Sequence, residues 1–239
     1  MTPPNPHWWH ITLHASAAGL VTEPIPAGDR SFELLLDLTS HRLAIVTSRG
    51  ERREVALQGQ SESRFYGEVL GALAEVNIAP LLDRSLFTDE TPGAYDPAAV
   101  ARFWQAFTQV DLAMRRFKDE LRGATSPVHL FPHGFDAVFA WFSGRLVPGV
   151  DPDDRESAEE MMGLGFSTGD DANPEPYFYV YPNPEGITDS PLPGKARWTT
   201  RGFTGAIMDY ADAAAEADPS KAVVGFLRAA QQAGASRMR

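Results

Sequence analysis

The chain has 239 residues, 43% of them hydrophobic, which is enough to bury a substantial core without disulfides or metal ions. It contains no cysteine, which excludes disulfides, thiolate zinc sites, iron–sulfur clusters and cysteine nucleophiles. The formal net charge of -11 would repel nucleic acid, and the apolar runs fall far short of the ~20 residues that cross a membrane, so we expect a soluble cytoplasmic protein.

The first part of the chain alternates apolar and polar residues with the period of two that is typical of strands. Short polar turns separate the alternating runs, which favours antiparallel neighbours. The predicted strands cover residues 7–13, 17–22, 31–38, 43–47 and 53–57.

Two helices are predicted next. The first covers residues 62–75, with Ser61 as its N-cap. The second covers residues 96–122, where Asp96 caps the start, Pro97 occupies the first turn and Gly123 ends the helix. An apolar stripe at three-four spacing along this second helix predicts that it lies across a sheet or joins two halves of the fold.

Strands dominate the second half of the sequence. The stretch from Ser126 to Arg145 cannot be one helix because Pro132 and Gly134 interrupt it, so we interpret it as two strands joined at 131–134. Further strands are predicted at 175–182, 196–200 and 205–210, and a closing helix at 220–234. Residues 161–166 could form a strand or an irregular crossing.

This order of elements predicts an α+β fold. We expect a largely antiparallel, curved sheet or two packed sheets, with about three covering helices. The chain would form a single domain over residues 1–239, or two lobes, 1–82 and 126–239, joined by the helix at 96–122.

The candidate catalytic residues lie in the apolar stretch at 126–145. His129 could act as a general base that Asp136 orients, and Arg145 could hold an anionic substrate. The alternative is structural: a histidine and an aspartate that are hydrogen-bonded inside the fold, and an arginine in an ion pair.

Four more residues are candidates for ligand binding. His10 and Glu160 could reach the same pocket, while Trp9 and Tyr179 could offer aromatic surface to a flat ligand. Because Tyr179 alternates with apolar residues, packing on a half-exposed sheet face is the alternative.

Histidine spacing argues against a simple metal site. In a regular strand residues i and i+4 lie ~13 Å apart, so His10 and His14 could not both bind one ion. The same distance would separate His129 from His133 if residues 129–133 formed a regular strand. A metal site would need ligands from several strands, for example His10, His129, Asp136 and Glu159 or Glu160. The glycine-rich nucleotide motifs do not occur either, so we predict neither a metal ligand set nor a cofactor.

The same stretch also carries a resemblance to a known family. The pattern S-P-V-H-x-F at 126–131, followed by F-D and F-S-G-R, resembles a signature of the bacterial family known as domain of unknown function 5996. The resemblance extends over nearly the whole chain, and it implies no activity. Further matching pieces are Trp9-His10, Gly19-Leu20, Ile25-Pro26, the strand at 32–37, Phe65-Tyr66, Phe103-Trp104 and residues 178–184.

The sequence therefore favours a protein that binds a small molecule or a cofactor-independent enzyme, with a polar pocket around His129, Asp136 and Arg145. Two alternatives remain open: an interaction module with an acidic surface, and a metal-dependent enzyme. No nucleic-acid or membrane partner is expected, and the sequence leaves the oligomeric state open.

Overall fold

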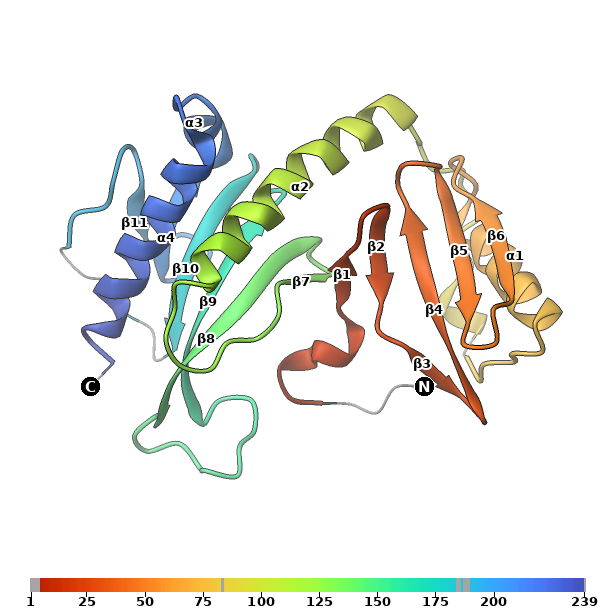
Figure 1. The fold of residues 1–239 in the computed structure, drawn as a ribbon, viewed down its shortest axis with the longest axis horizontal. Coiled ribbons are helices and arrows are strands. Elements are labelled where there is room, and N and C mark those ends of the chain that lie inside the picture. Colours follow the sequence, from red (N-terminus) through yellow and green to blue (C-terminus); the bar gives the residue numbers. More distant parts are fainter. Residues whose placement is uncertain (1–4, 83, 184–185, 187–189, 239) are drawn as a thin grey trace. The chain divides into compact units, whose positions relative to one another are not determined.

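The computed structural model describes residues 5–82, 84–183, 186 and 190–238. Its contacts divide the chain into two compact units. The first holds Asn5 and residues 10–106, and the second holds residues 107–238 together with Pro6–Trp9. The division falls within the helix α2 (Pro97–Lys118), and each unit contains its own set of neighbouring strands and a hydrophobic cluster (Figure 1).

The first unit is built on an antiparallel sheet with the order β1-β2-β4-β5-β6, and β3 also pairs with β4. The helix α1 (Glu62–Glu75) packs against this sheet and buries Leu73 and Val76 with Ile45. The side chain of Ser61 accepts a hydrogen bond from the Arg64 amide, as the predicted N-cap requires. The strands are β1 (Leu13–Ala15), β2 (Gly19–Thr22), β3 (Ile25–Ala27), β4 (Arg30–Asp37), β5 (Arg42–Thr47) and β6 (Arg52–Ala56).

One predicted strand is wrong. Residues 7–11 belong to the 3-10 element η1 (Pro6–Ile11), and the β-structure begins only at Leu13. His7 and Trp8 have φ values of 58° and 57°, which a strand cannot accommodate, and the His7 amide donates to Glu156 at 2.9 Å instead of to a strand partner.

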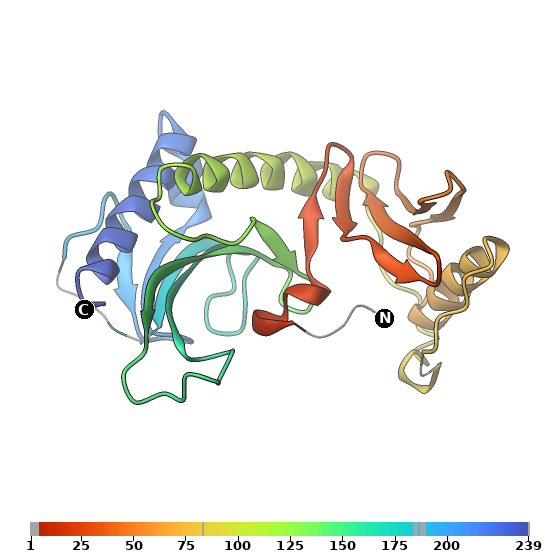
Figure 2. The ribbon, with the colours of Figure 1, turned by 60° about the horizontal axis from the view of Figure 1, so that its bottom comes forward.

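The second unit has an antiparallel sheet with the order β7-β8-β9-β10-β12-β11. Figure 2 shows these strands as a curved sheet with α4 (Pro219–Ala235) on one face. On this face Met162 meets α4 at Gly234, and the Phe139 ring lies 6.4 Å from that of Phe117 in α2. The strands are β7 (His129–Phe131), β8 (Asp136–Leu146), β9 (Glu159–Ser167), β10 (Tyr177–Asn183), β11 (Arg197–Thr199) and β12 (Gly205–Asp209), and a short helix, α3 (Tyr210–Ala214), precedes α4.

We call the face of the β7–β10 strands that lies opposite α4 the open face. Strand alternation and the antiparallel register decide which side chains it carries. Its members are His129, Phe131, Asp136, Val138, Ala140, Phe142, Met161, Gly163, Gly165, Ser167, Tyr177, Tyr179, Tyr181 and Asn183.

The predicted α+β class is confirmed: every strand pairing is antiparallel, the sheet is curved, and α1, α2 and α4 are the main helices. The long helix ends at Lys118, earlier than the predicted residue 122. Residues beyond it form turns, and the left-handed Gly123 (φ +98°) lies past the helix end.

Candidate functional site

Two tyrosines of β10 lie flat across glycines of β9 on the open face. A Cβ atom on Gly165 would lie 2.4 Å from the Tyr179 hydroxyl, and one on Gly163 would lie 2.4 Å from the Tyr181 ring. Because β9 has no side chain there, Tyr179 reaches over it and donates a 2.5 Å hydrogen bond to Asp136 at the start of β8. The glycines thus allow a tyrosine from one strand to bind a carboxylate two strands away.

This arrangement perturbs the tyrosines. Burial, followed by the charge of Asp136, holds the pKa of Tyr179 well above its ordinary value of 10.0, and the same causes raise the pKa of Tyr181. A second pair lies beside the first, where the Tyr177 hydroxyl donates to Asp170 at 2.5 Å. Burial and this bond raise the pKa of Tyr177 to about 12, and the bond holds the pKa of Asp170 below its ordinary value. These hydroxyls therefore act as hydrogen-bond donors near neutral pH, not as bases.

A cavity of about 410 Å³ opens over this face. One wall is the segment Pro6–Trp9, which contributes His7 and Trp9, and another is the loop between β8 and β9, which contributes Glu156. Most of its lining is aromatic or apolar, as is usual for small-molecule pockets. The remaining lining residues are His129, Phe131, Val138, Ala140, Ser157, Met161, Gly163, Tyr181, Pro182 and Asn183.

His7 is held in the cavity wall by an uncommon backbone. It and Trp8 are consecutive left-handed residues, a conformation that non-glycine residues adopt at a cost of roughly 1 kcal/mol or more each. The His7 ring packs 5.3 Å from Trp9 and 5.9 Å from Phe142. Its Nε2 atom is buried, has no hydrogen-bond partner among the described residues, and lies 4.0 Å from a Glu159 carboxylate oxygen.

A family model described as a family of unknown function (DUF5996) matches residues 1–239. The chain belongs to this family. No curated protein and no solved structure matches it. Among the described residues of this DUF5996 protein, no helix is long and apolar enough to cross a membrane.

The sheet of this DUF5996 member separates the predicted site residues. Arg145 and Glu160 lie on the helix-covered face, where Glu160 is 3% exposed and its Oε2 accepts from Ser143 at 2.8 Å and from the Arg145 Nε at 3.0 Å. Arg145 also donates to the carbonyl of Met238, so the pair ties the segment after α4 to β8. Neither residue lines the cavity.

The other predicted residues also divide. His129 and Asp136 are on the open face, and His129 lines the cavity beside Trp9, whose ring is 6.0 Å away. Asp136 bonds Tyr179 and is outside the cavity lining, as is Tyr179 itself. His10 belongs to the first unit, where its amide donates to Asn5 at 2.9 Å.

Of the lining residues, only His129 and Trp9 were candidate site residues from the sequence, and His7, Glu156 and Tyr181 are among those that were not. The alternation of tyrosines in β10 opposite the glycines of β9 was a signal for Tyr181. No local pattern could have found His7, because its position depends on a turn that the strand-like alternation concealed. Among the described residues, no group of three or more histidines or acids is placed to hold a metal ion.

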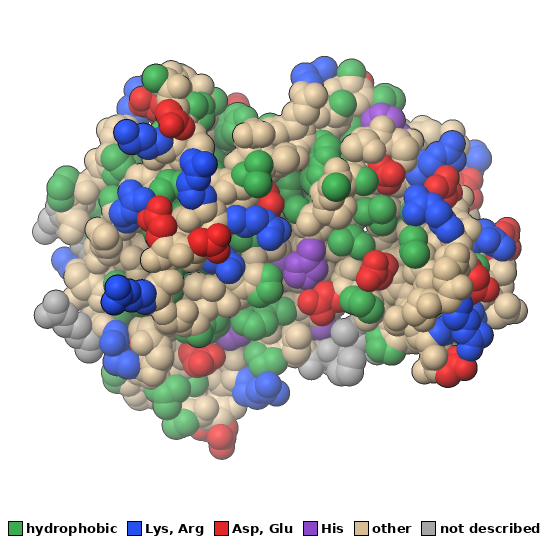
Figure 3. Space-filling view, viewed as in Figure 1, with side chains coloured by type: hydrophobic (Ala, Val, Ile, Leu, Met, Phe, Trp, Pro, Cys, Tyr) green, Lys and Arg blue, Asp and Glu red, His purple; other side chains and the backbone are tan. Residues whose placement is uncertain are grey.

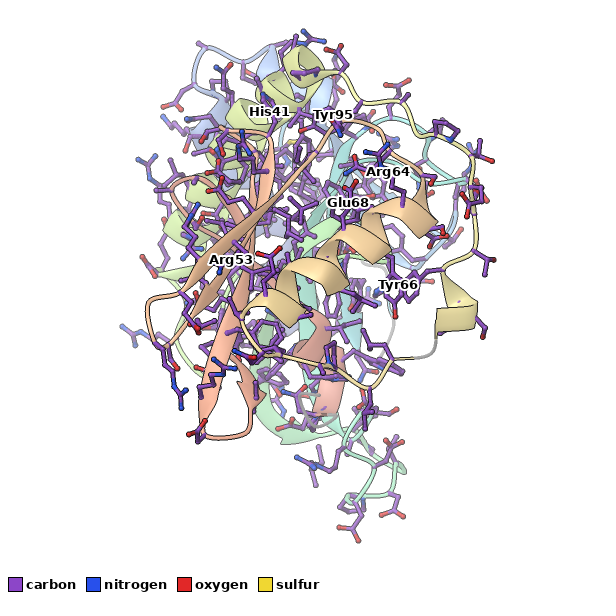
Figure 4. The ribbon with its side chains drawn as sticks, turned by 90° about the vertical axis from the view of Figure 1, so that its right-hand side faces the viewer. His41, Arg53, Arg64, Tyr66, Glu68 and Tyr95 are labelled. Carbon is purple, nitrogen blue, oxygen red and sulfur yellow. The ribbon has the colours of Figure 1, made fainter. Side chains whose placement is uncertain are left out.

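The first unit holds a smaller polar recess near the start of α1, lined in part by Gln60 and Arg64. Figure 4 labels Arg64 and its neighbour Glu68 on this helix. Arg64 bonds Glu68 at 2.8 Å, and Gln60 bonds the same carboxylate at 3.0 Å. His41 and Tyr95 form a further pair, with 2.9 Å between the ring nitrogen and the hydroxyl. His41 and Tyr95 lie outside the lining of the recess, while Gln60 and Arg64, which line it, are already bonded to Glu68, so the recess is the weaker candidate.

Proposed function

We propose that the second unit binds a small organic molecule in the cavity between Pro6–Trp9 and the open face of β7–β10. The observation that carries this proposal is the His7 side chain, whose buried Nε2 has no hydrogen bond among the described residues. Burying such an atom unpaired costs about 1–3 kcal/mol, and buried polar atoms in native proteins are nearly always paired. A ligand that bonds Nε2 accounts for both the unpaired atom and the strained backbone that holds it.

The dimensions and lining of the cavity support the same proposal. A volume of about 410 Å³ lies within the range of roughly 300–1,000 Å³ that is usual for ligand pockets. Trp9, Phe131 and Tyr181 offer apolar surface, while His7 and His129 offer polar atoms. This is the composition of a site that buries an organic body and orients it by few hydrogen bonds.

Two rival functions have less support. Catalysis by His129 with Asp136 as its orienting partner requires those groups to act together, but the carboxylate of Asp136 already accepts from Tyr179. An acidic interaction surface is not favoured by the face in Figure 3, where the described acidic side chains are interspersed with Lys and Arg.

The proposal is tested by blocking the cavity. We expect compounds from a fragment library to bind the wild-type protein in saturation-transfer NMR, and Ala140→Leu, which places a larger side chain in the lining, to abolish that binding. Ala214→Leu is the matched control, because Ala214 is exposed on α3. Circular dichroism would verify that both variants fold.

A second pair of variants tests His7. His7→Ala should weaken binding at least tenfold, whereas His133→Ala, which removes an exposed histidine outside the cavity, should leave it unchanged. If the fragments bound a folded Ala140→Leu protein as tightly as the wild type, the cavity would not be the binding site.

A further inference from the structure

The charges around the cavity restrict what it can bind. Glu156 is the only lining residue among those described that carries a permanent charge, and no Lys or Arg lines the space. Glu159 adds a second carboxylate, 4.0 Å from the His7 Nε2 atom. An anion brought into this space would meet like charges without a cation to offset them.

Arg145, the residue predicted to hold an anion, cannot supply that cation. It lies on the opposite face of the sheet, 2.9 Å from the Glu160 carboxylate, and also donates to Met238. Removing it from this pair would leave Glu160 buried and uncompensated. The cavity therefore excludes the anionic ligand that the sequence suggested.

The aromatic lining favours a cation. The negative faces of tryptophan, tyrosine and phenylalanine rings attract ammonium groups, most strongly where water is excluded. Trp9, Phe131 and Tyr181 contribute such rings to the lining. The Phe142 ring, which is outside the lining, packs 6.3 Å from that of Trp9.

The hydrogen-bonding groups specify the kind of cation. A neutral imidazole whose other nitrogen carries the proton accepts at Nε2, and a carboxylate accepts only. Glu156 is fixed beside His7, because its Oε2 accepts from the His7 amide at 2.9 Å. A protonated amine has N–H donors for both groups, which a quaternary ammonium lacks.

We infer that the ligand is a protonated organic amine, with its ammonium group at His7 and Glu156 and its apolar body against Trp9, Phe131 and Tyr181. This inference rests on the proposed binding function and names the chemical class of the ligand for the same cavity.

The test uses three probes of one size and shape that differ in charge: benzylamine, benzyl alcohol and benzoate. Dissociation constants are measured by NMR titration at pH 7.5. We expect benzylamine to bind at least tenfold more tightly than benzyl alcohol, and benzoate more weakly than either.

A charge-neutralising variant locates the preference. Glu156→Gln keeps an oxygen that can accept from His7 but removes the charge, so the preference for benzylamine over benzyl alcohol should fall at least fivefold. Asp153→Asn is the matched control: it removes an exposed acid from the same loop outside the cavity lining, and the preference should persist.

The inference and the proposed function fail in different ways. Equal binding of the three probes, stronger binding of benzoate, or no binding of benzylamine would overturn the amine inference, while loss of fragment binding in Ala140→Leu would still support the site. Benzylamine binding that persists unchanged in a folded Ala140→Leu protein would overturn both.

Discussion

Alanine at Gly165 should destabilise the second unit strongly. The added Cβ would lie 2.3 Å from the Tyr179 Cζ atom and 2.6 Å from the carbonyl oxygen of Ala137. The carbonyl belongs to the neighbouring strand and cannot withdraw, and moving the ring breaks the Tyr179–Asp136 hydrogen bond. Overpacking costs about 1–3 kcal/mol, and losing a hydrogen bond to a charged group costs roughly 1.5–3 kcal/mol. We therefore expect the free energy of unfolding to fall by roughly 2.5–6 kcal/mol.

Gly163→Ala is the matched comparison on the same strand. The three atoms nearest to its added Cβ all belong to the side chain of Tyr181, which is 37% exposed and has room to move. The expected loss is about 1–2 kcal/mol. Urea unfolding followed by circular dichroism measures both variants. Equal losses in the two proteins would refute the reasoning that the backbone contact and the Tyr179–Asp136 bond decide the cost.

Three further predictions concern the hydrogen bonds and ion pairs of ionisable side chains. Because folding raises the pKa of Tyr179, the unfolded chain loses the hydroxyl proton first as the pH rises, so the free energy of unfolding should fall above pH 10. The fall should be less steep in Tyr179→Phe, and an equal dependence of the free energy on pH in urea unfolding of the two proteins would contradict this. The hydrogen bond from Tyr177 lowers the pKa of Asp170, so that stabilisation is present above about pH 3.8 and is lost as the pH falls further; Tyr177→Phe should weaken this acid dependence in unfolding measured from pH 2 to 5. Arg145→Ala should lower the free energy of unfolding, measured in urea, by about 2–4 kcal/mol, a range that already allows for the partial exposure of Arg145. Adding Glu160→Gln should restore part of this loss, and no restoration would argue against an unpaired carboxylate as its cause.

Local rules in the sequence were sufficient for most of the elements. Apolar alternation, the Ser61 and Asp96 caps, and the Pro97 start predicted α1, α2 and the antiparallel strands close to their observed bounds. These features depend on neighbours within one helical turn or one strand, so they can be predicted without knowing the tertiary structure. The segment at 7–11 failed because its conformation depends on a distant partner, Glu156.

The sequence also contained part of the information that places the predicted site residues on opposite faces of the sheet. Successive side chains of a strand point to opposite faces of the sheet. Asp136 and Arg145 are an odd number of positions apart in β8, so a regular strand places them on opposite faces. Alternation could not say which face would be covered by α4 and which would be open.

Tertiary structure alone decided the cavity. His7, Glu156 and Tyr181 come from separate parts of the chain, and their meeting depends on the register of β8 with β9 and β10 and on the turn at Pro6–Trp9. Long-range pairings of this kind arise from packing and loop closure, which leave no periodic trace in the sequence. The sequence by itself therefore determined the elements and their alternating faces, and the packing of distant segments determined where a ligand can bind.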